Sequence, residues 1–217
     1  MPEALLTPNH TLLLRFALVN IVALGLVGAA WMQGWLDGFS EPRTWIISLA
    51  IFAVFVWGLS LTGFRLLHMN RALISLAAGD AGQGTPYGAT FDRLKATATD
   101  ERALATNMAR MEMGNQIGAI RYIANSLVFL GLIGTVIGFI IGLSGIDAAA
   151  TTNVDKIAPM ITKLINGMSV ALYTTLLGAV LNIWLNINLR ILTDGSVRLL
   201  ALLVEKSVPH DPAAGAA

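Results

Sequence analysis

Two apolar stretches of this chain carry hydroxyl and amide side chains at helical spacing, a pattern that can line a path for ions. The polar residues in these stretches, 123–145 and 164–189, include Thr135, Thr174, Thr175, Asn182 and Asn186. A hydroxyl or amide inside an apolar helix can replace part of an ion's hydration shell. It can also bond a neighbouring helix. Which role applies depends on the elements that position these side chains.

Both stretches are predicted to be helices that cross a membrane. No charged residue lies between Arg121 and Asp147, or between Leu164 and Leu189. A span needs roughly 20 apolar residues, and each stretch is that long. At about 100° per residue, small and polar residues fall on one side of each helix. These residues are Gly131, Gly134, Thr135, Gly138, Gly142 and Gly145 in the first helix, and Gly167, Ala171, Thr174, Thr175, Gly178, Asn182 and Asn186 in the second. Leu172, Leu176, Val180, Ile183 and Ile187 occupy the far side of the second helix, which is suited to lipid.

Thr135 and Thr175 each lie near the midpoint of their stretch. In an antiparallel hairpin the two hydroxyls are expected at about the same depth. A single Thr in a membrane helix commonly bonds its own backbone, but two at one depth predict a shared polar constriction. Asn182 and Asn186 extend this face towards the cytoplasm, either as part of a water path or as interhelical hydrogen bonds.

Composition indicates an integral membrane protein. The 217 residues are 55% hydrophobic and 12% charged, with a mean hydropathy of +0.69, whereas soluble domains carry about 25% charged residues. The net charge of +1 gives no reason to expect nucleic acid binding. The chain has no Cys and only three isolated His, so neither a metal site nor a cofactor is predicted, and nothing indicates an enzyme.

The fold is predicted to be all-α, with one membrane domain over 1–217. Its parts are four spans at about 12–33, 45–66, 123–145 and 164–189, a cytoplasmic helical segment 67–122 and a cytoplasmic tail 190–217. Lys and Arg are concentrated in the middle segment, which places it and both termini in the cytoplasm. The Gly-rich run 79–88 is predicted to be a turn, because no Lys-Ser/Thr follows it as a phosphate loop requires. The charged helix after it is a solvated face or a docking surface for a cytoplasmic partner.

Three functions fit these features. Gly134, Gly138 and Gly142 form two overlapping G-x-x-x-G steps, which favour close helix packing and would suit an oligomerising scaffold. The polar row would suit a passive pore. No Asp, Glu, His or Lys lies in the central region of any span. Proton relays need an intramembrane ionisable group, so a proton-driven machine would have to take its carboxylate from another polypeptide.

The segments LGLIGTVIG (130–138) and GMSVALYTTLLGAVL (167–181) resemble the core of the MotA/TolQ/ExbB proton-channel family. Thr135 and Thr175 match the two pore threonines of that family, with the adjacent Thr174 as the alternative to Thr175. The resemblance implies a multi-pass protein of the bacterial cytoplasmic (inner) membrane. It also implies a homopentamer whose third and fourth helices line a central pore around two copies of a single-span partner.

The partner in that family carries an intramembrane Asp and a periplasmic domain, and the proton motive force drives the motor. The resemblance favours H⁺ over Na⁺ as the transported ion, although two hydroxyls suit either. It assigns the ion pathway to Thr135 and Thr175, with Thr174, Asn182 and Asn186 beside them. Packing around the partner helix is assigned to Gly131, Gly134, Gly138, Gly142 and Gly178.

Three features depart from the family pattern. Four spans resemble the flagellar-stator branch, whereas other members generally have three. The middle segment is shorter than in flagellar stators. Asn182 lies where many relatives carry a proline.

Overall fold

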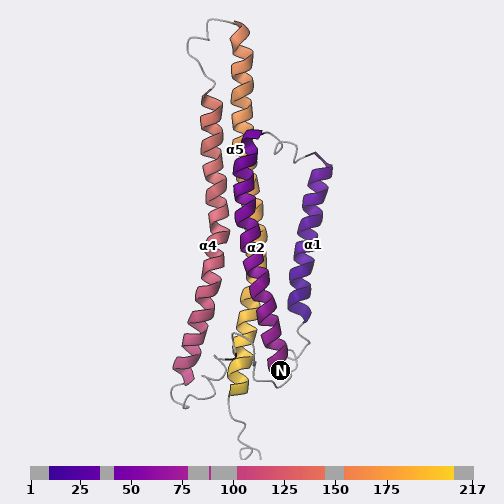
Figure 1. Cartoon of the computed structure of the whole chain (residues 1–217), viewed down its shortest axis with the longest axis vertical. Coiled ribbons are helices and arrows are strands. Elements are labelled where there is room, and N and C mark those ends of the chain that lie inside the picture. Colours follow the sequence, from indigo (N-terminus) through magenta and orange to yellow (C-terminus); the bar gives the residue numbers. More distant parts are fainter. Residues whose placement is uncertain (1–9, 35–41, 78–87, 89–101, 145–153, 208–217) are drawn as a thin grey trace, which may run out of the picture. The chain divides into compact units, whose positions relative to one another are not determined.

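The computed structural model describes residues 10–34, 42–77, 88, 102–144 and 154–207, and the regular structure in these residues is helical. The helices are α1 (His10–Met32), α2 (Pro42–Ala77), α4 (Arg102–Leu143) and α5 (Val154–Ser207) (Figure 1). All four are long and apolar enough to cross a membrane. The predicted all-α class and the four candidate spans are therefore confirmed. Most of the Gly-rich run 79–88 lies outside the described residues, and so do residues 91–101, where the sequence predicts the start of the third long helix.

The helix ends follow local chemistry. Pro42 begins α2, and proline is favourable in the first turn because the amide it lacks would have no partner there. α1 ends at Met32, and Gly34 follows with a φ of 72°, a left-handed conformation in which glycine avoids the penalty of a Cβ. The Gly34 amide donates to the Trp31 carbonyl at 3.0 Å, which closes the last turn.

The chain forms two compact units, and every helix contributes to both. The hairpin unit comprises Asn20–Ser60 and Arg121–Ile187. Its core is a cluster of apolar residues from α2, α4 and α5, namely Ile51, Phe55, Ala124, Leu127, Leu181, Trp184 and Leu185. The Phe55 and Trp184 rings lie 4.9 Å apart between centroids, within the range of favourable aromatic pairs.

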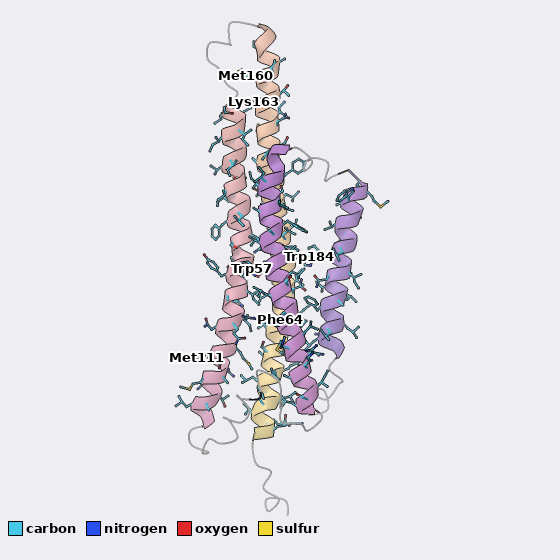
Figure 2. All side chains as sticks on the ribbon, in the orientation of Figure 1. Trp57, Phe64, Met111, Met160, Lys163 and Trp184 are labelled. Carbon is cyan, nitrogen blue, oxygen red and sulfur yellow. The ribbon has the colours of Figure 1, made fainter. Side chains whose placement is uncertain are left out.

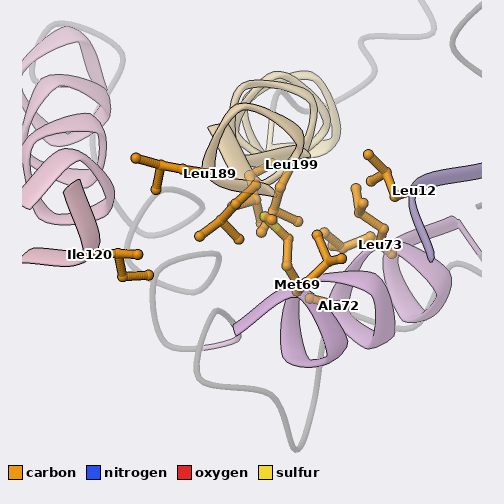
Figure 3. Packing of buried hydrophobic residues seen from close by; sticks show 11 residues of the cluster. Leu12, Met69, Ala72, Leu73, Ile120, Leu189 and Leu199 are labelled. Carbon is orange, nitrogen blue, oxygen red and sulfur yellow. The ribbon is translucent and has the colours of Figure 1, made fainter. Parts of the chain in front are cut away.

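The end unit comprises Met1–Val19, Leu61–Ile120 and Asn188–Ala217. Its core draws on all four helices and includes Leu12, Leu66, Met69, Ala72, Leu73, Leu76, Ile120, Leu189, Leu192, Leu199 and Leu203 (Figure 3). Most of these residues lie outside the predicted spans. The parts of the helices that extend past the predicted spans therefore contribute to an apolar core of their own.

Candidate functional site

The predicted site lies in the hairpin that α4 and α5 form within the hairpin unit, where the two helices run side by side (Figure 1). Small residues face each other along this contact. The buried members are Gly131, Gly134, Gly138 and Gly142 on α4, and Gly167, Ala171, Thr174 and Gly178 on α5. Residues without large side chains let two helix backbones approach closely in a membrane. All five glycines that were predicted to pack around the partner helix lie in the α4–α5 contact within this chain.

The approach leaves no room for a methyl group at Gly134, Gly138, Gly167 or Gly178, as two of these glycines illustrate. A Cβ on Gly138 would lie 2.6 Å from the Ala171 amide nitrogen and 2.7 Å from the Gly167 carbonyl oxygen. A Cβ on Gly178 would lie 2.6 Å from the Leu127 carbonyl oxygen. These neighbours are backbone atoms, which cannot move aside as a flexible side chain can.

The register of the hairpin is constant along its length. Gly142 packs on Leu164, Gly131 packs on Thr175, and the Ala124 carbonyl accepts a bond from Asn182. Moving a given number of residues towards the start of α4 thus moves the contact by the same number of residues towards the end of α5. At 1.5 Å per residue this antiparallel contact extends over roughly 27 Å, close to the thickness of a bilayer's hydrocarbon core.

Thr175 lies at the exposed edge of this contact. Its Oγ1 donates across the hairpin to the Gly131 carbonyl at 3.3 Å. Thr135 is half-buried, and its Oγ1 donates within α4 to the Leu132 carbonyl at 2.6 Å. Thr135 follows Gly131 by four residues, so the two hydroxyls are separated by about one helical turn, roughly 6 Å, along α4.

Thr174 has a different environment from its neighbour. It is completely buried, and its side chain packs directly on Gly134. Its hydroxyl bonds its own helix, at 3.0 Å from the Val170 carbonyl and 3.1 Å from the Ala171 carbonyl. Of the two adjacent threonines, Thr174 therefore fills the hairpin contact and Thr175 presents its hydroxyl at the edge.

The two asparagines bond backbone carbonyls. Asn182 Nδ2 donates to the Ala124 carbonyl of α4 at 2.7 Å, and Asn186 Nδ2 donates to the Asn182 carbonyl of its own helix at 3.0 Å. Both residues are half-buried. Asn182 thus makes an interhelical hydrogen bond, one of the two roles that the sequence left open.

The far side of α5 is exposed, as the periodicity predicts. Leu172, Leu176 and Ile183 are 71%, 59% and 60% exposed, and Val180 and Ile187 are exposed as well. α4 exposes Phe129, Leu132, Val136 and Phe139 in the same unit. The hairpin therefore presents apolar surface around a polar edge.

One polar contact was not predicted from the sequence. The side chain of Trp184 on α5 is labelled in Figure 2. Its Nε1 donates to Asn20 Oδ1 at 3.0 Å, which joins α5 to α1. The available signal was Asn20 itself, an amide among apolar residues in the first predicted span. Its partner could not be inferred, because the spacing within α1 says nothing about which helix packs on it.

The described residues include no group of three or more His, Cys, Asp or Glu placed to hold a metal ion. The chemical groups at the hairpin are hydroxyls, amides and backbone carbonyls. Such groups can solvate an ion or position an acid, but they do not exchange protons near neutral pH.

Comparison with known proteins gives one match. The model of the MotA/TolQ/ExbB proton channel family matches residues 89–204, more than half of the chain. The matched range contains all of α4 and nearly all of α5. No curated protein and no solved structure matches.

Proposed function

Because the chain belongs to the MotA/TolQ/ExbB proton channel family, we propose that it is the channel-forming subunit of an ion-driven motor or energy-transducing complex. Family membership makes it a membrane transport component rather than an enzyme, and it implies a complex with partner proteins. The finer assignment that we propose is a homopentamer around two copies of a single-span protein. H⁺ is the proposed ion, and the partner supplies an intramembrane Asp.

The need for a partner's carboxylate is supported by the content of the spans. The central regions of the two hairpin helices hold hydroxyl and amide groups but no Asp, Glu, His or Lys. Ion-coupled transport through a bilayer depends on an ionisable group within it. The proposed subunit therefore provides the polar surroundings of an acid that arrives on another helix.

The observation that carries the proposal is the exposed hydroxyl of Thr175. It lies at mid-span, at the edge of a hairpin whose exposed side chains are otherwise largely apolar. Its bond to the Gly131 carbonyl uses the hydroxyl proton and leaves the oxygen lone pairs available to accept. In the proposed pathway Thr135 and Thr175 hydrate and orient the carboxylate. Thr174 and Asn182 hold the surrounding hairpin through packing and a hydrogen bond, and Asn186 lies on the same side of α5.

The proposed orientation has both termini and the middle segment in the cytoplasm of the bacterial inner membrane. It rests on the Arg and Lys residues between the second and third helices and after the fourth. The second candidate function is a scaffold without coupled transport, and the close-packed glycines support it, because helix packing alone would explain them.

Replacing the Thr175 hydroxyl with a methyl group tests the proposal. Thr175→Val keeps the shape of the side chain, and we expect ion-driven work to fall by about ten- to a hundredfold, because hydrogen bonds to charged groups contribute about 1.5–3 kcal/mol. The measurement is proton flow or mechanical output of the complex with its single-span partner in lipid vesicles.

Thr174→Val is the matched control, because the Thr174 hydroxyl bonds only its own helix in the structure. This variant should assemble and retain at least half of the wild-type rate. Equal rates for wild type and Thr175→Val would favour the scaffold instead.

A further inference from the structure

Two side chains of α5 donate hydrogen bonds to backbone carbonyls of α4, and they are placed one heptad apart on both helices. Asn182 donates to the Ala124 carbonyl and Thr175 donates to the Gly131 carbonyl. Ser169, Thr174 and Asn186 of α5, by contrast, bond carbonyls of α5 itself. These two bonds therefore tie the hairpin together at two levels.

The two bonds differ in length and exposure. The Asn182 bond is 2.7 Å long, at the short end for an amide donor. The Thr175 bond is 3.3 Å long, well beyond the 2.7–2.8 Å typical of hydroxyl donors, and the side chain is exposed. Within α4, each accepting carbonyl is already the acceptor of a helix amide, so neither depends on the cross-helix bond for its own satisfaction. Thr175 can thus release Gly131 at little cost.

We propose that the Thr175 hydroxyl alternates between two acceptors, the Gly131 carbonyl and the partner's carboxylate, while the Asn182–Ala124 bond keeps the hairpin in register. This inference rests on the proposed function, because the partner's acid is part of it. The hydroxyl keeps its own proton throughout. The proton that binds and leaves is the one on the partner's acid.

The state of the acid decides which acceptor Thr175 uses. A charged carboxylate accepts a hydrogen bond roughly twice as strong as a neutral acceptor does, so it draws the hydroxyl away from Gly131. A protonated acid donates its own proton to the Thr175 oxygen, and the hydroxyl then returns to Gly131. Thr135 stays in place during this exchange, because its bond to the Leu132 carbonyl is short and lies within one helix.

Asn182 is a positioning residue in this scheme. The hairpin contact near Thr175 is made by Gly131, Gly134 and Gly178, with the Thr174 side chain packed on Gly134. When Thr175 releases Gly131, the Asn182 bond still joins α5 to α4 one heptad away. Loss of that bond should let α5 shift along α4 and misplace Thr175 relative to the acid.

Infrared spectroscopy of the Gly131 carbonyl tests the exchange directly. The chain is labelled with ¹³C-carbonyl glycine and studied in complex with its partner in bilayers, with the partner's intramembrane acid either intact at alkaline pH or replaced by its amide. Subtraction of the Thr175→Val spectrum cancels the other labelled glycines. We expect the remaining carbonyl band to move to higher frequency when the acid is charged, because Gly131 loses its second donor.

A band that is the same in both states would overturn the proposed exchange. If Thr175→Val also stops proton-driven work, the proposed function stands and only the exchange fails. If the wild-type complex carries no proton-driven flow, the proposed function itself fails.

The role of Asn182 is tested by Asn182→Leu, with Ser169→Ala as the control because the Ser169 hydroxyl bonds its own helix. The chain has no Cys, so spin labels at Phe129→Cys and Leu176→Cys, both on exposed positions, report the α4–α5 distance. Asn182→Leu should broaden this distance and reduce proton-driven work several-fold without moving its pH midpoint. Asn182→Gln should restore both.

An Asn182→Leu protein that works at the wild-type rate would refute the positioning role. A shifted pH midpoint with an unchanged distance would place Asn182 on the ion path instead.

Discussion

Glycines have two different environments along α4. Those from Gly131 to Gly142 that face α5 meet its backbone or Thr174, whereas a Cβ on Gly114 or Gly118 would find nothing of this chain within 4 Å. Glycine in a helix interior is about 1 kcal/mol less favourable than alanine. The same substitution should therefore have opposite effects at the two kinds of position.

Gly138→Ala is expected to destabilise the hairpin by about 1–3 kcal/mol, the usual range for overpacking, because its Cβ would lie 2.6 Å from a backbone nitrogen. The free energy of unfolding in bicelles, measured by steric trapping, gives the value. Gly114→Ala is the control and should be neutral or stabilising by up to about 1 kcal/mol. Equal effects at the two positions would mean that α4 and α5 do not pack through these glycines.

At the scale of elements, α1 is the helix least supported by packing in the hairpin unit. Its residues Ile21, Leu24 and Leu26 are more than 60% exposed. Its attachments there include Ala23 against the core and the bond between Asn20 and Trp184. A hydrogen bond between two side chains is directional, so it restricts the rotation of such a helix and its depth in the membrane. Apolar contacts are not directional and do not restrict the helix in this way.

Asn20→Leu should weaken the docking of α1 by about 0.6 kcal/mol, and by at most about 1.7 kcal/mol, the range measured for hydrogen bonds between membrane helices. A double-mutant cycle with Trp184→Phe isolates this pair. We expect the two substitutions together to cost less than the sum of their separate effects. Additive effects would show that the Asn20–Trp184 bond contributes nothing to stability.

The sequence predicted the helices better than it predicted their ends. The spans at 45–66 and 123–145 were predicted to adjoin a helical segment over 67–122, and α2 and α4 do continue past Arg65 and Arg121. The continuation of α5 past Arg190 to Ser207, in the predicted tail, was not predicted as helix. Hydropathy reports where a helix leaves the membrane and not where it stops. The signal for continuation was the spacing of Leu192, Leu199 and Leu203, which face the core of the end unit.

The sequence also predicted some features of the candidate site and not others. Periodicity placed Thr174 and Thr175 on the same small-residue side, but it could not tell which hydroxyl would be buried. That depends on where α4 crosses α5, which is set by the contact of Thr174 with Gly134. The Asn182–Ala124 bond was equally out of reach, because its acceptor is a backbone carbonyl and every residue has one.

At the scale of the whole molecule, cations from two helices stabilise the end unit. Lys206 of α5 donates to the Leu76 carbonyl in the last turn of α2, where the helix dipole favours a positive charge. Arg65 of α2 donates to the Gln116 carbonyl of α4. Together with the apolar core, these bonds make the helix ends a packed body, which suits the cytoplasmic side in the proposed orientation.

The proposed orientation is open to direct measurement because the chain has no Cys. Single cysteines at Gln33 and Ser144 should react from outside the cell with a membrane-impermeant maleimide. Cysteines at Arg71 and Ala201, which are exposed in the end unit, should react only after the membrane is opened. Labelling of Arg71→Cys in intact cells would reverse the orientation.

The close contact between the backbones of α4 and α5 also excludes water from the space between these two helices. Gly142 meets Gly167, and Gly138 meets Ala171, with separations too small for even a methyl group, and a water molecule of about 1.4 Å radius needs more space than that. Water therefore has no room to pass between α4 and α5 of one subunit at these contacts. Any conducting route must run along its outer surface and be closed by a second protein surface, so a subunit waiting for assembly does not leak through its own hairpin.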